Sequence, residues 1–208
     1  MKREISELLT KLDKEYKNAL SKARMLNDNM EDVYLDALRM LSGFVSANGG
    51  EYIAEGSCRK VFKVGNYALK IASTKAGLAQ NQLECKIEPS KFLNKIHRHD
   101  KHNLPSWVLT DYCKPATTYH IRKTLKVTPK TFDAMVTAKR FNTVINRDYL
   151  KKMSKYNVAT QYINFMAKYD LLGGDIMSHR LDNYGVNPQG KLVLLDYGLD
   201  DKVWDKYY

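Results

Sequence analysis

The fold of this chain is decided by one stretch near its end, Gly174 to Gly198, which reads GDIMSHRLDNYGVNPQGKLVLLDYG. Within it, Asn187-Pro188-Gln189-Gly190 has the composition of a type I turn, with proline in the second position and glycine in the fourth. The segments on either side, Tyr184–Val186 and Lys191–Leu195, can pair as strands. We therefore predict a hairpin across this turn.

The predicted hairpin brings two oxygen-bearing side chains to the same end. Asn183 and Asp196 lie 13 positions apart, one on each side of the turn. Hard cations such as Mg²⁺ take oxygen ligands of this kind, together with substrate phosphates. The pattern fits a metal site, and it equally fits a surface hairpin with a polar rim.

Length and composition limit the class of protein. The chain has 208 residues, of which 44% are hydrophobic, enough for one domain or two joined lobes with a sizeable core. No apolar run approaches the ~20 residues of a membrane span, and the N-terminus leads into no signal-like block. The three scattered cysteines indicate reduced thiols. We expect a cytoplasmic protein with no membrane partner.

The net charge of +11 favours anionic partners, such as nucleic acid, nucleotide or an acidic protein surface. The lysines are spread along the whole chain rather than gathered in a block. A basic surface without a specific anionic partner is therefore the alternative.

Residues 1–48 carry a helical pattern in two segments. Apolar side chains recur with helical spacing over residues 4–26 and again over 33–44, and Asn27-Asp28-Asn29 separates the two. Such a pair either covers the following domain or forms a dimerisation arm. Because the heptads are too few and irregular for a sustained coiled coil, the covering pair is favoured.

From Glu51 the pattern changes to three short strands. A turn of small residues, Gly56-Ser57, separates the first two, and backbone N–H groups in such a turn can lie over a phosphate. Lys70 lies in the third strand between Leu69 and Ile71, so strand alternation puts it on the face opposite both. The alternative is an ordinary strand lysine whose side chain is exposed to solvent.

A helix is predicted over residues 76–95, shortened or kinked at Pro89, with Glu84 and Glu88 one turn apart. Either carboxylate could pair with Lys70. Residues 96–103 are predicted to be a polar loop whose three histidines complete no zinc pattern.

A strand is predicted at residues 107–113, stopped by Lys114-Pro115, and residues 116–170 are predicted to be mostly helical. One of these helices would begin near Pro129 and another would run from Tyr149 to Tyr169. Glycines at positions 173 and 174 are expected to end the latter.

Taken in order, these segments resemble the protein kinase-like superfamily over about residues 51–200. The turn at Gly56 and Ser57 resembles a glycine-rich loop reduced to one glycine. Ala68-Leu69-Lys70 resembles the Ala-Ile-Lys strand, and Trp107 to Pro115 the strand and hinge that reach the adenine. The resemblance implies that Lys70 contacts the phosphates of ATP. A glutamate of the following helix, Glu84 in first place and Glu88 in second, would hold Lys70 as part of this nucleotide-binding site.

The resemblance extends to the hairpin. Asp196-Tyr197-Gly198 is similar to Asp-Phe-Gly, which implies that Asp196 and Asn183 hold Mg²⁺. The catalytic aspartate of the family stands five residues before that asparagine, where this chain has Ser178. Gly174-Asp175-Ile176 resembles the Gly-Asp-Leu of small-molecule kinases, so Asp175 is our candidate base. Asp182, or no functional base, remains open.

The resemblance implies an α+β, two-lobed kinase-like fold with an N-terminal helical extension (1–48), a small ATP-binding lobe (49–115) and a reduced helical lobe with the catalytic hairpin (116–208). Only ten residues follow Gly198, too few for a peptide platform, and in this the chain resembles compact bacteriophage kinase-like proteins. The host cytoplasm is then its expected location.

We expect a phosphotransferase that uses ATP and Mg²⁺ on an unknown acceptor, protein or small molecule. The shortened glycine loop and the displaced Asp175 favour a pseudokinase scaffold as the alternative. Nucleotidyl transfer onto a protein, or nucleic-acid binding through the basic surface, is less favoured.

Overall fold

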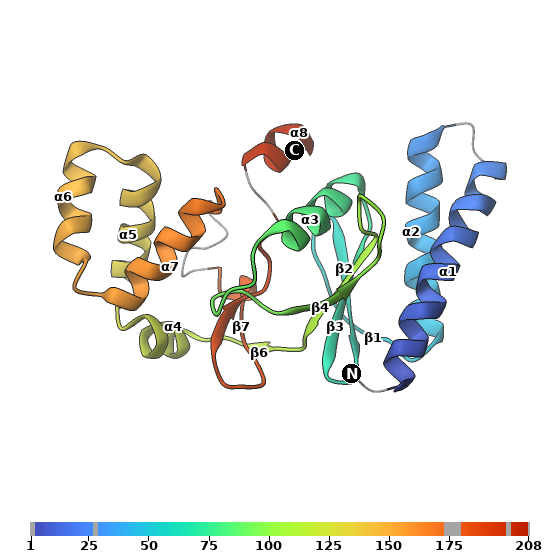
Figure 1. Ribbon diagram of the computed structural model, residues 1–208, viewed down its shortest axis with the longest axis horizontal. Coiled ribbons are helices and arrows are strands. Elements are labelled where there is room, and N and C mark those ends of the chain that lie inside the picture. Colours follow the sequence, from blue (N-terminus) through green and yellow to red (C-terminus); the bar gives the residue numbers. More distant parts are fainter. Residues whose placement is uncertain (1–2, 27–28, 173–179, 199–200, 208) are drawn as a thin grey trace. The chain divides into compact units, whose positions relative to one another are not determined.

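The computed structural model describes residues 3–26, 29–172, 180–198 and 201–207 (Figure 1). It confirms the predicted α+β class, because its helices accompany two sheets whose strands pair antiparallel. Apart from its last two residues, the chain divides into two compact units. Unit 1 comprises residues 1–86 and 95–112, and unit 2 comprises residues 87–94 and 113–206. Residues 87–94 thus belong to unit 2, although they lie within the predicted small lobe.

Unit 1 is built on a five-stranded sheet with the strand order β1-β2-β3-β5-β4. Its strands, in chain order, are β1 (Glu51–Glu55), β2 (Arg59–Val64), β3 (Tyr67–Ala72), β4 (Ile96–His99) and β5 (Trp107–Asp111). β3 pairs with β2 on one edge and with β5 on the other, and helices cover its two faces, so five of its six residues are buried.

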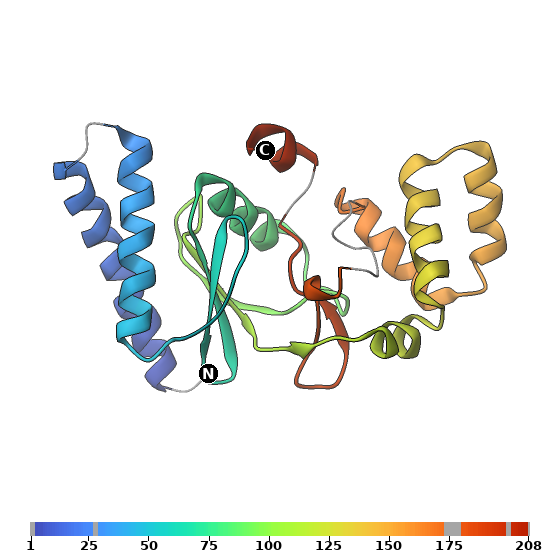
Figure 2. The ribbon, with the colours of Figure 1, turned by 180° about the vertical axis from the view of Figure 1, so that it is seen from behind.

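Two N-terminal helices, α1 (Arg3–Leu26) and α2 (Met30–Ala47), cover one face of this sheet (Figures 1 and 2). Their apolar stripes form one core with side chains from β2, β3 and β5, including Leu69 and Trp107. Trp107 Nε1 also donates to Asp13 Oδ1 at 3.2 Å. The pair therefore packs as a cover of the sheet, the arrangement that the irregular heptads favoured.

Helix α3 (Lys75–Lys86) lies on the opposite face of the sheet. Its first turn passes so close to the β1–β2 connection that a Cβ on Gly77 would lie 2.1 Å from the carbonyl oxygen of Cys58. Glycine is required there by space, not by backbone conformation. The helix ends three residues before Pro89, earlier than the predicted Lys95, because the residue before a proline is disfavoured in helical conformation.

The polar loop predicted over residues 96–103 is wrong in its first half, which forms the edge strand β4. Ile96 and Arg98 are half-buried whereas His97 and His99 are exposed, which is the alternation of a strand. A register shift between Ile96 and Arg98 interrupts its pairing with β5. Such irregularities are typical of edge strands, and they weaken the sequence signal.

Unit 2 contains a three-stranded sheet with the order β6-β7-β8. Its strands are β6 (Lys114–Pro115), β7 (Tyr184–Val186) and β8 (Leu192–Leu194). The strand predicted over residues 107–113 ends at Asp111, before Lys114-Pro115, and these two residues pair with β7. Leu194 N donates to Phe92 O at 2.8 Å, and Asn94 N donates to Leu194 O at 2.9 Å. The segment from Phe92 to Asn94 thus extends the sheet at β8.

Four helices complete the main part of unit 2: α4 (Thr118–Leu125), α5 (Pro129–Phe141), α6 (Val144–Met153) and α7 (Asn157–Lys168). The single helix predicted over Tyr149–Tyr169 is wrong, since a turn over residues 154–156 divides it and Tyr156 N donates to Met153 O. Helix α7 ends at Lys168, followed by Asp170 with a left-handed φ of 59°. The predicted glycine cap lies outside the described residues.

A short helix, α8 (Asp201–Tyr207), follows the hairpin. Among the described helices, none combines the length and the apolar character that a membrane crossing requires.

Candidate functional site

The predicted lysine and its helix partner meet in unit 1. Lys70 Nζ lies 2.9 Å from both carboxylate oxygens of Glu84, and Arg59 Nη1 lies 2.8 Å from one of them. All three side chains are at least nine-tenths buried. Lys70 is therefore not the solvated strand lysine that the sequence left open.

Strand and helix geometry explain this meeting. Leu69 and Ile71 join the core beneath α1 and α2, so Lys70 projects from the other face of β3, where α3 lies. Glu84 stands in the last turn of α3, one turn after Asn81, and both are fully buried. Asn81 accepts a hydrogen bond from Arg59 and donates one to the backbone, so the helix is fixed at two points.

Cys85 follows Glu84 directly in α3, and its thiol has a raised pKa. Burial, and after it the negative charge of Glu84, raise the pKa of the Cys85 thiol to about 12. Lys70 and Arg59 oppose that shift with smaller effects. Cys85 is thus a protonated thiol at neutral pH, which makes it a weak nucleophile.

Glu88, the second candidate partner of Lys70, has other contacts. Its carboxylate accepts from Lys168 Nζ at 2.9 Å and from the Tyr169 hydroxyl at 2.8 Å. Hydrogen bonds from these two groups lower the pKa of Glu88 below its ordinary value. Glu84 is the carboxylate that contacts Lys70 in the structure.

The turn at Gly56 and Ser57 connects β1 to β2. Gly56 N donates to Arg59 O at 2.9 Å, which closes the turn, and Ser57 Oγ lies 3.4 Å from Cys58 Sγ. A Cβ on Gly56 would meet no described atom closer than 4.0 Å. The fold itself therefore tolerates a side chain at Gly56. Its role in binding a nucleotide stays a prediction.

The hairpin in unit 2 forms as the turn composition predicts. Gly190 N donates to Asn187 O at 2.8 Å, and Leu195 N donates to Asn183 O at 2.7 Å at the open end. Asp196 follows Leu195 directly, so Asn183 and Asp196 stand at the same end of the hairpin. Asn183 belongs to a short 3-10 turn and is buried.

The candidate base Asp175 lies outside the described residues. Its alternative, Asp182, is exposed and pairs with the guanidinium of Arg180 at 3.3 and 3.4 Å. That pairing gives Asp182 a local structural partner.

The donor chemistry at the hairpin fits a hard cation. Asn183 supplies an amide oxygen and Asp196 a carboxylate, and Mg²⁺ is bound in proteins by such groups together with substrate phosphates. Within the described residues, no cluster of three or more His, Cys, Asp or Glu side chains is placed to hold a metal by itself. A cation here would need additional oxygen ligands from the nucleotide or water.

The histidine-rich segment has structural contacts instead. His97 Nε2 lies 2.8 Å from Asp111 Oδ1, and His102 contacts Asp100 through its backbone and its ring. Asp100 also accepts from both the backbone N–H and the hydroxyl of Ser106. These bonds hold the β4–β5 connection closed.

Arg59 is the site residue that the sequence analysis did not single out. Strand β2 pairs with β3 so that Val61 lies opposite Lys70, and Arg59 stands two residues from Val61 on the same strand face. The alternation of β2, combined with that register, was the available signal. Register cannot be read from the residues of one strand alone.

The predicted residues are thus grouped in two places. Lys70, Glu84 and the Gly56 turn belong to unit 1, whereas Asn183 and Asp196 belong to unit 2. That they act together on one nucleotide stays a prediction.

Comparison with known proteins adds little. No family model matches the sequence, and no curated protein matches it. Among solved structures the chain is similar to the co-crystal structure of WbdD and kinase inhibitor LY294002, with a TM-score of 0.38 and 11% identity. The match covers 71% of this chain and 32% of that one, so the chain spans about a third of that protein's length. At this level of likeness, a function has to be argued from the residues themselves.

Proposed function

We propose that this chain is a kinase-like protein that binds ATP with Mg²⁺ and transfers a phosphoryl group to an acceptor, either a protein or a small molecule. The observation that carries the proposal is the buried contact of Lys70 with both oxygens of Glu84, at 2.9 Å. It supports the role of Lys70 as a positioned cation for the phosphates of ATP.

The energetics of burial support this interpretation. Removing a lysine and a glutamate from water costs several kcal/mol per ion, and their attraction offsets that cost only with good geometry. A buried pair of this kind is therefore weak evidence for stability, and an apolar pair of similar volume would serve the fold as well. A fixed ammonium position is the property that phosphate binding needs.

Each residue has a specific role under this proposal. Lys70 contacts the phosphates, Glu84 fixes the ammonium, and the turn at Gly56 and Ser57 lays backbone N–H groups over the phosphates. Asp175 orients the acceptor hydroxyl and takes its proton.

Asn183 and Asp196 would hold Mg²⁺ at the end of the hairpin. The ion supplies neutralisation of the negative charge that develops on the phosphates. The residues of this chain then have mainly a positioning task, since phosphoryl transfer depends on alignment and charge.

A second candidate is a pseudokinase that binds nucleotide without transfer. Two observations favour it: the loop keeps one glycine, and Asp175 stands eight residues before Asn183, where the family has five. Both candidates share nucleotide binding and differ in catalysis, so they are separated by different experiments.

The first experiment is calorimetry with ATP, with and without Mg²⁺, on the wild type and on Lys70→Met. Loss of one charge-assisted hydrogen bond should weaken ATP binding about 10- to 100-fold. Glu84 keeps Arg59 as a partner in this variant, so the fold should persist. The matched control is Lys63→Met in the neighbouring strand, where Lys63 forms an exposed pair with Glu51.

Absence of ATP binding by the wild type would overturn the proposal, and equal weakening by Lys63→Met would assign the effect to net charge. Where ATP binds, γ-labelled against α-labelled ATP distinguishes phosphoryl from nucleotidyl transfer. Asp175→Asn should abolish transfer and leave binding near normal. Steep salt dependence of DNA or RNA binding would instead support a nucleic-acid function.

A further inference from the structure

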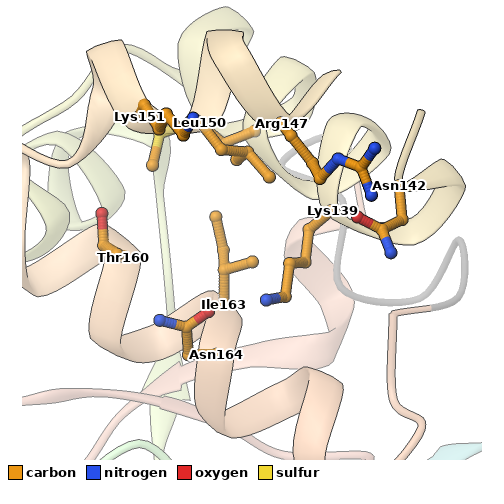
Figure 3. A pocket seen from close by; sticks show the side chains of 9 residues that line it. Lys139, Asn142, Arg147, Leu150, Lys151, Thr160, Ile163 and Asn164 are labelled. Carbon is orange, nitrogen blue, oxygen red and sulfur yellow. The ribbon is translucent and has the colours of Figure 1, made fainter. Parts of the chain in front are cut away.

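A pocket of about 380 Å³ lies within unit 2, between the helices α5, α6 and α7 (Figure 3). Its lining includes the apolar side chains Met135, Leu150 and Ile163 and the cationic side chains Lys139, Arg147 and Lys151. A volume of this size is at the lower end of the range for small-molecule sites, about 300–1,000 Å³. A lining that combines apolar and cationic side chains indicates an amphipathic anion.

The charge around this pocket is strongly one-sided. From Pro129 to Lys168 the chain has eight lysines and arginines and two aspartates. Of the lining cations, Lys151 lies 3.7 Å from Asp148 in an exposed pair. In the described part of the chain, no carboxylate forms an ion pair with Lys139 or Arg147.

A second observation concerns Thr160. This residue lines the pocket, and its Oγ1 atom is buried with no hydrogen-bond partner among the described residues. Buried hydroxyl groups nearly always have a partner, and an exception indicates a water or ligand. In Figure 3, Thr160 stands at one end of the pocket, and Arg147 with Asn142 at the other.

Helix α6 supplies a third observation. None of its ten residues is buried, although Leu150 and Arg147 reach from it into the pocket. An amphipathic helix normally buries one face against its neighbours. A bound molecule between α6 and α7 would complete the packing of α6.

We propose that this pocket binds a phosphorylated small molecule, with its phosphate on Lys139 and Arg147 and its apolar part against Leu150 and Ile163. A phosphate monoester carries about −1.5 to −2 charges near pH 7 and therefore matches several cations better than one carboxylate does. Arginine binds phosphate in a bidentate manner, which adds orientation. The site uses none of the residues assigned above to ATP or Mg²⁺.

The test uses phenyl phosphate on the full chain, in low salt, without ATP or Mg²⁺. Calorimetry should show saturable one-to-one binding that is at least 10-fold tighter than for inorganic phosphate or phenol. Absence of saturable binding overturns the proposal. Equal affinity for benzoate also overturns it, because the site would then accept any aromatic carboxylate. A short single-stranded oligonucleotide that binds far more tightly and displaces phenyl phosphate would assign the site to nucleic acid instead.

Arg147→Gln and Lys139→Gln should each weaken phenyl phosphate binding about 10-fold or more. The matched control is Lys152→Gln, which removes the same charge from α6 at a residue outside the pocket lining. Equal weakening by Lys152→Gln would overturn the site in favour of general surface attraction.

Thr160→Val removes the hydroxyl at nearly constant volume. It should leave phenyl phosphate binding unchanged or slightly tighter, because the phosphate lies on Lys139 and Arg147 at the other end of the pocket. It should leave the melting temperature of the free protein unchanged or higher, because a buried hydroxyl without a partner is unfavourable. A several-fold loss of binding would contradict the proposed orientation of the ligand.

Two further measurements separate this site from the proposed ATP site. Lys70→Met should leave phenyl phosphate binding unchanged, so failure of ATP binding and failure of this pocket are distinguishable. Hydrogen exchange over residues 144–153 should slow when phenyl phosphate is bound, since α6 gains a packing partner. Unchanged exchange there, with binding intact, would place the ligand elsewhere.

Discussion

Replacement of Glu84 with glutamine should cost unit 1 much of its stability. The carboxylate receives hydrogen bonds from two buried cations, and the amide that replaces it is neutral. At 2.8–2.9 Å and an effective dielectric constant of 20, each pair has a gross attraction of about 6 kcal/mol, most of which offsets the cost of burial. Removing one partner of a buried pair typically costs about 3–5 kcal/mol, because charges stay buried without compensation.

The expected shift in melting temperature follows from the length of the chain. At about 2–4 °C per kcal/mol for a protein of this size, Glu84→Gln should lower the melting temperature by roughly 6–20 °C. The matched control is Glu7→Gln. Glu7 and Arg3 form an ion pair at 2.8 Å, as short as that of Glu84 with Arg59, but on the surface. Exposed pairs contribute less than about 1 kcal/mol.

Fluorescence gives a local readout. The chain has two tryptophans, of which Trp107 is buried in the central sheet and Trp204 is exposed. In a Trp204→Phe background, urea unfolding followed by fluorescence therefore reports on unit 1. If Glu84→Gln and Glu7→Gln unfolded at the same urea concentration, the importance of the buried cluster would be refuted.

Three other changes test the packing, the thiol chemistry and the hairpin. Gly77→Ala should destabilise by about 1–3 kcal/mol or more in urea unfolding, because its Cβ would meet the carbonyl of Cys58, whereas Gly43→Ala, with open space around it, should be neutral or slightly stabilising; similar values for the two would contradict the close contact. Cys85 should react with iodoacetamide at pH 8 much more slowly in the folded than in the urea-unfolded protein, as measured by peptide mass spectrometry, because its folded pKa is raised from 9.0 to about 12. By linkage its stabilising effect is present below pH 9 and is lost as the pH rises toward 12, and equal reaction rates would refute the shift. Asn187→Ala should cost about 1–2 kcal/mol, since the side-chain oxygen accepts from two backbone N–H groups of the turn, and unchanged hydrogen exchange in the hairpin would argue against it.

The hairpin was predictable because its signals are local. The Asn-Pro-Gln-Gly turn fixes the reversal, and the lengths of the flanking runs fix which residues meet at the open end. The sequence therefore predicts that Asn183 and Asp196 stand at one end of the hairpin. The sequence limits the candidate partners of Lys70 to Glu84, in first place, and Glu88. It does not decide between them, because the choice depends on where α3 ends.

Two of the errors, at β4 and at Arg59, have their physical origin in non-local pairing. The polar sequence of β4 predicts a loop. In the structure, its pairing with β5, over an irregular register, overrides that local preference. The division between α6 and α7 was missed because the apolar spacing runs through the turn at residues 154–156. Arg59 was missed for a related reason, since only the register of β2 against β3 brings it beside Lys70.

Residues 87–94 affect how the chain folds during synthesis and which fragments of it can be expressed alone. The chain leaves unit 1 after Lys86, returns to it at Lys95 and leaves again after Tyr112, so neither unit is a continuous piece of sequence. During synthesis, the apolar side chains of Phe92 and Leu93 precede their partner strand β8 by about a hundred residues. A nascent chain that ends near residue 115 could close its five-stranded sheet, yet it would expose these two side chains to water and to other chains. Expression of the first half alone should therefore give a folded but aggregation-prone fragment, and chaperones that hold exposed apolar segments should bind it at this site.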